Sequence, residues 1–218
     1  MRGDFIRWDW IGGHLDEIGA RLLEHVQLTV IAVVVGFAIA LPLGIYAFRH
    51  RRARGPFAGF TSVLYTIPSV ALFAFLQPFS GLSTLTAEIG LVAYTLVILV
   101  RNVVAGLDGV PHDIREAARG MGLSERQLLW RVDLPVALPV LMAGIRLATV
   151  STVALVTVTT LIGKGGMGYF ILQIGIRRSF PTALIVGAVL SVALALTADG
   201  LLLWAQRRAT PWAGARAS

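Results

Sequence analysis

Apolar residues fill five long stretches of this 218-residue chain, and polar residues gather in the gaps between them. A helix rises about 1.5 Å per residue, so about 20 apolar residues cross the roughly 30 Å hydrocarbon layer of a bilayer. The pattern predicts membrane-spanning helices at residues 26–48, 57–79, 86–107, 135–162 and 182–205. The second stretch contains Pro68, which lacks a backbone donor and predicts a kink or a break there.

Composition agrees with a chain dissolved mainly in lipid, because 56% of the residues are hydrophobic, only 14% are charged, and the mean hydropathy is +0.76. We expect an all-α polytopic protein with one transmembrane domain over residues 26–205. Residues 1–25 are expected to form an interfacial or extracytoplasmic segment, and residues 206–218 a cytoplasmic tail. The chain has no cysteine, which excludes disulfides and thiolate chemistry.

The basic residues predict the orientation of the chain in the membrane. Eleven of them fall in the 49–56 loop, the 108–134 loop and the C-terminal tail, and six fall on the other side. This bias predicts an N-terminus outside and a C-terminus in the cytoplasm. The net charge of +7 is spread over the gaps between apolar stretches, so it gives no reason to expect nucleic acid binding.

Small residues recur every four positions in two of the predicted spans, a pattern that lets helix backbones approach closely in a bilayer. The two stripes are Ala32, Gly36, Ala40 and Gly44, and Ala183, Gly187, Ser191 and Ala195. They predict close helix packing, either within this chain or against a second subunit.

The 108–134 loop carries the most informative pattern. Glu116-Ala117-Ala118 is followed after three residues by Gly122, and after nine more by Val132-Asp133-Leu134-Pro135. Two short helices are expected here, one capped by Asp113 with Glu116 at its third position and one by Ser124 with Gln127. Gly120 and Gly122 permit the turn between them, and Pro135 and Pro139 suit the start of the next span.

This loop resembles the EAA loop of ABC importer permeases, whose pattern is E-A-A, three residues, G, nine residues and I-x-L-P. Val132 replaces the usual isoleucine. The resemblance implies a type I importer core with about five spans and a loop that docks on an ABC ATPase dimer, with Arg115 or Arg119 offering charges at the rim. The residues it assigns to ATPase coupling are Glu116, Ala117, Ala118, Gly122, Val132, Leu134 and Pro135.

Further stretches are similar to the small permeases that import osmoprotectants such as glycine betaine, carnitine, choline or proline. They are Gly36, Leu41-Pro42-Leu43-Gly44, Ile67-Pro68-Ser69, and the run from Ile162 to Gly168. The resemblance implies a second permease subunit, an extracytoplasmic solute-binding protein, and ATP and Mg bound only by the partner ATPase, with no cofactor or metal in this chain. A methionine-type permease and an ATP-independent channel or carrier stay open as alternatives.

Hydroxyls inside the fourth span could line a polar pathway, although hydroxyls that bond back to their own helix are the favoured interpretation. The candidate pathway residues are Thr149, Thr152 and Thr159, together with Pro68 and Ser69. A flexible outer turn at Gly163, Lys164, Gly165 and Gly166 is a candidate outer gate or binding-protein contact. Asp199 is expected to pair with Arg101 or Arg146, and the four histidines are expected at surfaces or interfaces.

The turn satisfies G-x-G-x-x-G but follows a membrane span rather than a strand, so we do not expect it to bind a nucleotide. The chain also lacks the G-x-x-x-x-G-K-[ST] sequence of a phosphate-binding loop. We therefore expect the chain not to hydrolyse ATP itself.

Overall fold

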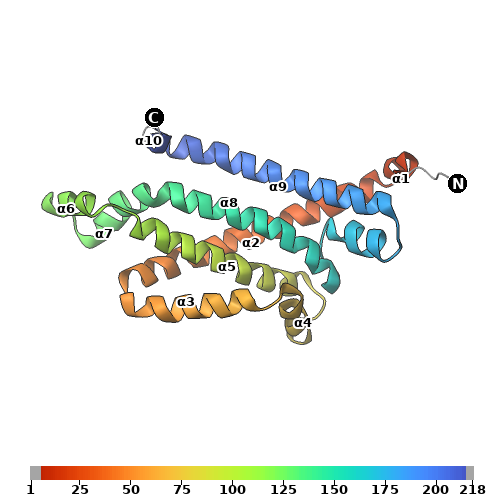
Figure 1. Ribbon diagram of the computed structural model, residues 1–218, viewed down its shortest axis with the longest axis horizontal. Helices are drawn as coiled ribbons and strands as arrows, with labels where there is room; N and C mark the ends of the chain where they lie inside the picture. The colour runs from red at the N-terminus through yellow and green to blue at the C-terminus, as the bar shows by residue number, and fades with distance from the viewer. Residues whose placement is uncertain (1–5, 215–218) are drawn as a thin grey trace.

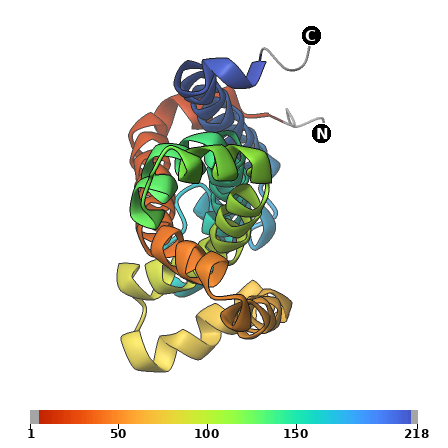
Figure 2. The same cartoon turned by 90° about the vertical axis from the view of Figure 1, so that its left-hand side faces the viewer.

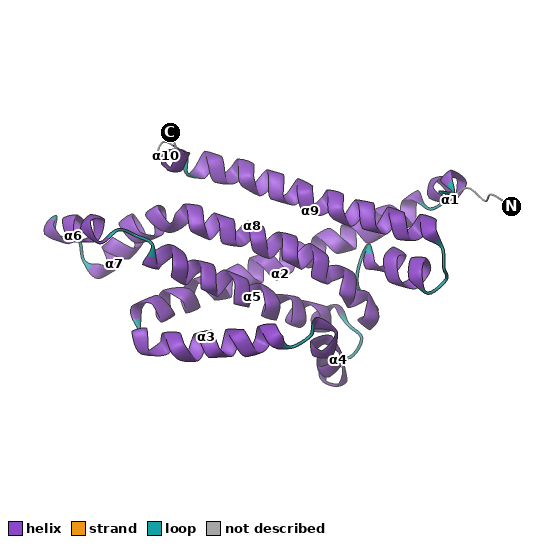
Figure 3. Ribbon diagram, viewed as in Figure 1, coloured by secondary structure: helices purple, strands orange, loops and turns teal. Residues whose placement is uncertain are grey.

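The computed structural model describes residues 6–214, which form helices joined by short turns (Figures 1 and 3). The elements in chain order are α1 (Trp8–Gly13), α2 (Leu15–Arg49), α3 (Arg51–Thr66), α4 (Ser69–Ser80), α5 (Thr84–Asp108), α6 (His112–Gly120), α7 (Glu125–Leu128), the π-helix η1 (Leu129–Asp133), α8 (Leu134–Val158), the 3-10 helix η2 (Thr159–Ile162), the π-helix η3 (Tyr169–Ile176), α9 (Pro181–Ala209) and α10 (Pro211–Gly214).

Helices α2, α5 and α8 pack against one another and form the centre of the bundle. Helix α9 lies on one side of this centre, and α3 and α4 lie on the opposite side (Figures 1 and 2). Within residues 6–214, four helices are long and apolar enough to cross a membrane: α2, α5, the continuous run Glu125–Ile162, and α9. The bent pair of α3 and α4 supplies the fifth candidate span. The prediction of an all-α protein with about five spans is confirmed.

The second predicted span is broken at Pro68. Residues Arg54–Leu64 and Ser69–Ser80 meet at 92°. Proline disfavours helical backbone in the residue before it, and Ile67 is accordingly extended, with φ −69° and ψ 123°. The carbonyl of Ile67 accepts a hydrogen bond from the hydroxyl of Tyr94 on α5, which satisfies a backbone group freed by the break.

The first span begins earlier than predicted, since α2 starts at Leu15 rather than near residue 26. The charged residues of the first turns are compatible with a helix because they pair with neighbouring groups. Arg21 pairs with Glu24 at 3.0 Å and lies over the Tyr169 ring, 4.3 Å from its centroid. In α1, Trp10 packs edge-on against Phe170 of η3. The N-terminal segment is therefore part of the packed structure from α1 onward.

Both small-residue stripes lie at close contacts within the chain. A Cβ atom on Gly36 would lie 2.8 Å from Cγ2 of Thr95, and one on Gly44 would lie 2.6 Å from Cβ of Val103. This stripe therefore seats α2 against α5. On α9, Gly187 lies against Met167 and η3, whereas Ala195 is only half-buried. The intramolecular interpretation of the stripes is confirmed.

Candidate functional site: a helical loop at one end of the bundle

Helices α6 and α7 project together from one end of the bundle, between α5 and α8 (Figure 1). Glu116, Ala117 and Gly122 are exposed, whereas Ala118 is buried. Val132, Leu134 and Pro135 are half-buried where the chain returns to the bundle. The predicted coupling residues thus lie on one loop, but Ala118 faces its own chain and only Glu116, Ala117 and Gly122 present open surface.

Only one of the two predicted helix caps forms. Ser124 and Gln127 make the capping box: the Ser124 amide donates to Oε1 of Gln127 at 2.9 Å, and the Gln127 amide donates to Oγ of Ser124 at 3.4 Å. The Asp113 cap was predicted wrongly, because α6 already begins at His112, after Pro111, and Asp113 lies inside its first turn. Gly122 forms the turn between the helices with φ +83°, as predicted.

The exposed charges of the loop pair locally. Nε of Arg119 donates to Oε1 of Glu125 across the α6–α7 turn at 2.9 Å, and this hydrogen bond raises the pKa of Arg119 above its ordinary value. His112 Nδ1 lies 3.5 Å from Oε1 of Glu116. Both pairs are exposed, so they contribute little to stability, and Glu116 remains accessible from solvent.

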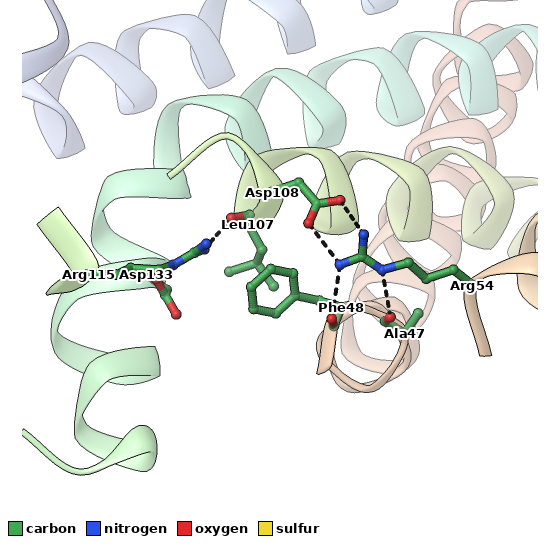
Figure 4. A network of polar contacts seen from close by, with 7 residues as sticks. All are labelled: Ala47, Phe48, Arg54, Leu107, Asp108, Arg115 and Asp133. Atoms are coloured by element: carbon green, nitrogen blue, oxygen red, sulfur yellow. Dashed lines mark hydrogen bonds and ion pairs between the residues drawn. The ribbon is translucent and has the colours of Figure 1, made fainter. Parts of the chain in front are cut away.

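Arg115 points into the bundle rather than toward the rim, so of the two arginines expected at the rim only Arg119 is exposed there (Figure 4). Its Nε donates to Oδ1 of Asp133 at 2.7 Å, and its Nη2 donates to the carbonyl of Leu107. The guanidinium carbon lies 5.0 Å from the centroid of the Phe48 ring. The Arg115 and Asp133 side chains are only 15% and 5% exposed. The two charges therefore pair with each other inside the chain.

A second arginine, Arg54, lies close by at the same end of the bundle (Figure 4). Arg54 holds Asp108 through two hydrogen bonds of 2.8 and 3.0 Å. It also donates to the carbonyls of Ala47 and Phe48. This contact fixes the α2–α3 turn to the end of α5 without contacting α6.

The hydroxyls of the fourth span bond back to their own helix. Those of Thr149, Thr152 and Thr159 donate to the carbonyls three or four residues earlier at 2.7–2.8 Å. Thr152 and Thr159 are fully buried, and Thr152 Oγ1 also lies 3.1 Å from Oγ1 of Thr95 on α5. These residues therefore lie between helices of this chain, which favours the alternative that the hydroxyls are structural.

Pro68 and Ser69 instead line an open groove of ≈ 410 Å³ at the α3–α4 break. Its wall also includes Thr66, Tyr94 and Ser151. Hydroxyls from four helices, α3, α4, α5 and α8, and the interrupted backbone therefore meet in one groove.

The glycine-rich turn is tightly packed, not a flexible surface turn. Gly165, Gly166 and Gly168 are buried, and a Cβ on Gly166 would lie 2.7 Å from the carbonyl oxygen of Arg21. Gly163 is exposed and Lys164 half-buried. Of the four predicted outer-gate residues, these two alone present surface in the described part of the chain.

His25 was predicted wrongly as a surface or interfacial residue, because it is fully buried beneath this turn. Its Nδ1 accepts the amide of Met167 at 3.3 Å, so the proton lies on Nε2, which donates to the carbonyl of Val153 at 3.0 Å. The imidazole thus joins α2, α8 and the turn. Its position seven residues before Ala32, on the buried stripe of α2, was the sequence signal that could have found it.

Asp199 pairs with Arg146 rather than Arg101, through two hydrogen bonds of 2.8 Å between α9 and α8. Arg101 donates to Oγ of Ser62 at 3.1 Å instead. One of the two predicted alternatives is therefore confirmed, and α8 and α9 are joined by a bidentate ion pair.

Glu88 on α5 is a residue that the sequence reasoning missed. Both carboxyl oxygens are buried, and neither has a hydrogen-bond partner within residues 6–214. It precedes Thr95 and Asn102 at seven-residue intervals, and those two residues face α8. A buried polar group without a partner costs about 1–3 kcal/mol.

We therefore expect Glu88→Leu to raise the free energy of unfolding by about 1–3 kcal/mol, because it removes that cost. Thermal unfolding of the purified chain in detergent measures the change, with the exposed Asp16→Asn as a matched loss of charge. A lower melting temperature for Glu88→Leu than for Asp16→Asn would contradict the expectation.

The chain is similar over most of its length to characterised permeases. It is 38% identical to the carnitine transport permease protein OpuCB of Listeria monocytogenes, over 93% of this chain and 94% of that protein. It is also 38% identical to the osmoprotectant import permease protein OsmW of Salmonella typhimurium, over 93% of this chain and 98% of that protein. It is 34% identical to the choline transport system permease protein OpuBB of Bacillus subtilis, over 89% of each.

Solved structures share the fold. The inward-facing MetNI methionine ABC transporter has a chain with a TM-score of 0.80 at 23% identity, covering 87% of this chain and 94% of that one. A chain of an amino acid ABC transporter crystallised with histidines has a TM-score of 0.74 at 18% identity, and the match covers 93% of this chain and 99% of that one. The fold is thus that of MetI-like importer permeases, as the sequence predicted. A family model matches residues 32–211, and this chain belongs to the family it describes, the binding-protein-dependent transport system inner membrane components.

Proposed function

We propose that this chain is the transmembrane subunit of an ATP-driven importer for small compatible solutes of the glycine betaine, carnitine, choline and proline class. The main observation behind this proposal is the projecting α6–α7 loop. Its Glu116 and Ala117 are exposed and Gly122 forms a sharp turn, and these features suit docking on another protein. The names of the similar permeases from Listeria, Salmonella and Bacillus support the solute class.

In this proposal α6 and α7 seat on a cytoplasmic ABC ATPase dimer, which binds ATP and Mg. The C-terminal end of α9 lies at the same end of the bundle as this loop, and the N-terminus at the opposite end (Figure 1). Docking in the cytoplasm therefore requires the C-terminus inside and the N-terminus outside. The distribution of arginines in the sequence supports the same orientation.

The solute pathway is proposed along the groove at the α3–α4 break. Interrupted backbone is not tolerated against lipid tails, but it is tolerated against protein or water. Pro68, Ser69 and Ser151 therefore suit a surface that faces a second permease subunit across a hydrated path. Thr149, Thr152 and Thr159 are left with a packing role. The solute-binding protein would dock at the opposite end from α6, where Gly163 and Lys164 present surface.

A methionine-type permease is the alternative within the same fold. The likeness to the methionine transporter, at 23% identity, speaks for the fold alone. Labelled glycine betaine and labelled methionine, offered to the reconstituted complex with the cognate binding protein, separate the two. Uptake by this chain in proteoliposomes without any ATPase would instead support an autonomous channel or carrier.

The coupling role is tested by Gly122→Val. A β-branched residue at φ +83° costs at least about 1–2 kcal/mol, so the turn should reopen and α6 should shift against α7. We expect ATP-dependent uptake of labelled glycine betaine by the complex to fall about tenfold, with the variant still present in the membrane at normal abundance.

Gly120→Ala in the same loop is the matched control, since a Cβ added there would meet no described atom within 4 Å and the φ of Gly120 is not positive. It should leave uptake unchanged. Normal uptake and normal ATPase co-purification for Gly122→Val would defeat the coupling role.

A further inference from the structure

We propose that Arg115, together with Asp133, is the joint that makes α6 move as one body with the ends of the spanning helices. This inference rests on the proposed function and assigns positioning residues that the loop pattern does not specify: Arg115 precedes it, and Asp133 stands at its variable position. Neither side chain is available to the ATPase, because the pair is buried in its own chain.

Arg115 contacts three spans from one position on α6. Its Nη2 bonds the Leu107 carbonyl at the end of α5, its Nε bonds Asp133 at the start of the α8 run, and its guanidinium group stacks near Phe48 at the end of α2. Figure 4 shows these groups around the arginine. A displacement of α6 is therefore passed to α2, α5 and α8 at once.

Apolar packing gives α6 little other attachment. Among the residues His112–Gly120, Ala118 is the buried one, and the flanking segments are short turns. The guanidinium fork fixes direction as well as distance, which a single apolar contact does not. The ion pair is thus the firm connection between this helix and the bundle.

The local backbone favours this geometry. Asp133 is the last residue of the π-helix η1, which departs from α-helical geometry just before α8. Such π-helical turns are frequent at functional sites, because the extra residue changes the direction of the side chains on one turn. Here Asp133 is 4% exposed and turned toward Arg115.

The neighbouring pair of Arg54 and Asp108 offers a matched control. It lies at the same end of the bundle, and Arg54 also lies over the Phe48 ring, 5.7 Å from its centroid. Its two hydrogen bonds of 2.8 and 3.0 Å, however, join α3 to the end of α5 and leave α6 out. Loss of its geometry should disturb the bundle locally without releasing the loop.

The test uses the complex of this chain with its ATPase and binding protein in proteoliposomes, and compares Arg115→Lys and Asp133→Asn with Arg54→Lys and Asp108→Asn. ATP hydrolysis and labelled glycine betaine uptake are measured in the same vesicles. We expect hydrolysis within about twofold of the parent for all four, and uptake per ATP lowered about tenfold only for the first two. An unchanged ratio in Arg115→Lys, or an equal loss in both pairs, would overturn the joint.

If the Asp133→Asn variant does not assemble, a distance measurement between α6 and α8 tests the proposal instead. The parent chain has no cysteine, so spin labels at Gly120→Cys on α6 and Val140→Cys on α8 are the two labels on this chain, and a complex in which one chain is labelled reports the distance between them. In the complex, Arg115→Lys should broaden the distribution of this distance, and Arg54→Lys should not. Identical distributions in the two variants would contradict the proposal that Arg115 and Asp133 fix α6 to the bundle. If the parent complex shows no ATP-dependent uptake, the proposed function itself fails, whereas the distance measurement still judges the joint.

Discussion

Replacing Gly168 with alanine is expected to abolish accumulation of folded protein in the membrane. The added Cβ would overlap the carbonyl oxygen of Thr157 and lie 2.7 Å from its Cα. These are backbone atoms, so no rotamer change relieves the contact. Overpacking of this kind costs typically about 1–3 kcal/mol and more where backbone must move, a large part of a total stability of about 5–15 kcal/mol.

The position of Gly168 extends the damage. The residue follows Met167, whose amide is bound by the buried imidazole of His25, and precedes the π-helix η3 that packs on α9. A shift of the turn therefore loosens α2, α8 and α9 together. The yield of monodisperse protein after detergent extraction measures the effect.

Gly200→Ala on α9 is the control, because no described atom lies within 4 Å of the Cβ position there. In an exposed helix interior this change should stabilise by about 0.5–1 kcal/mol. Recovery of Gly168→Ala at the level of Gly200→Ala would show that the turn yields more easily than its contacts indicate.

The spanning helices were predictable because a bilayer sets both their length and their composition. The stripe of Ala32, Gly36, Ala40 and Gly44 also predicted where α2 is closely packed, since helix periodicity alone decides which residues share a face. The break at Pro68 followed from the missing backbone donor. Each of these properties depends on a few neighbouring residues.

The inner contacts of the loop were not predictable in this way. The sequence places Arg115 beside the exposed Glu116, yet its partners Leu107, Asp133 and Phe48 come from three other elements. The π-helix before α8 changes the helical phase, so periodicity misjudges which side Asp133 faces. For His25, the hydrogen-bonding partner Met167 is 142 residues away.

The bidentate pair of Arg146 and Asp199 is expected to show strong coupling in a double-mutant cycle. Asp199 lies ten residues before the end of α9, which is about 15 Å along the helix, so it lies within the span rather than at its border. Asp199→Leu leaves Arg146 without its carboxylate in a setting poor in water. Removing one partner of a buried ion pair is strongly destabilising, and this pair is partly exposed at its helix surface, so we expect a smaller but measurable lowering of the melting temperature.

Arg146→Met together with Asp199→Leu should regain most of that loss, because two apolar side chains of similar length suit a lipid-covered seam between α8 and α9. Thermal unfolding of the parent, both single variants and the double variant in detergent gives the coupling energy, which is expected to be favourable and different from zero. Gln206 also lies near Arg146, at 3.5 Å from its Nη1, and Gln206→Leu reports how far this amide takes over when Asp199 is removed. Additive losses in the double variant would mean that the two charges are each satisfied elsewhere, and α9 would then be held against α8 by packing alone.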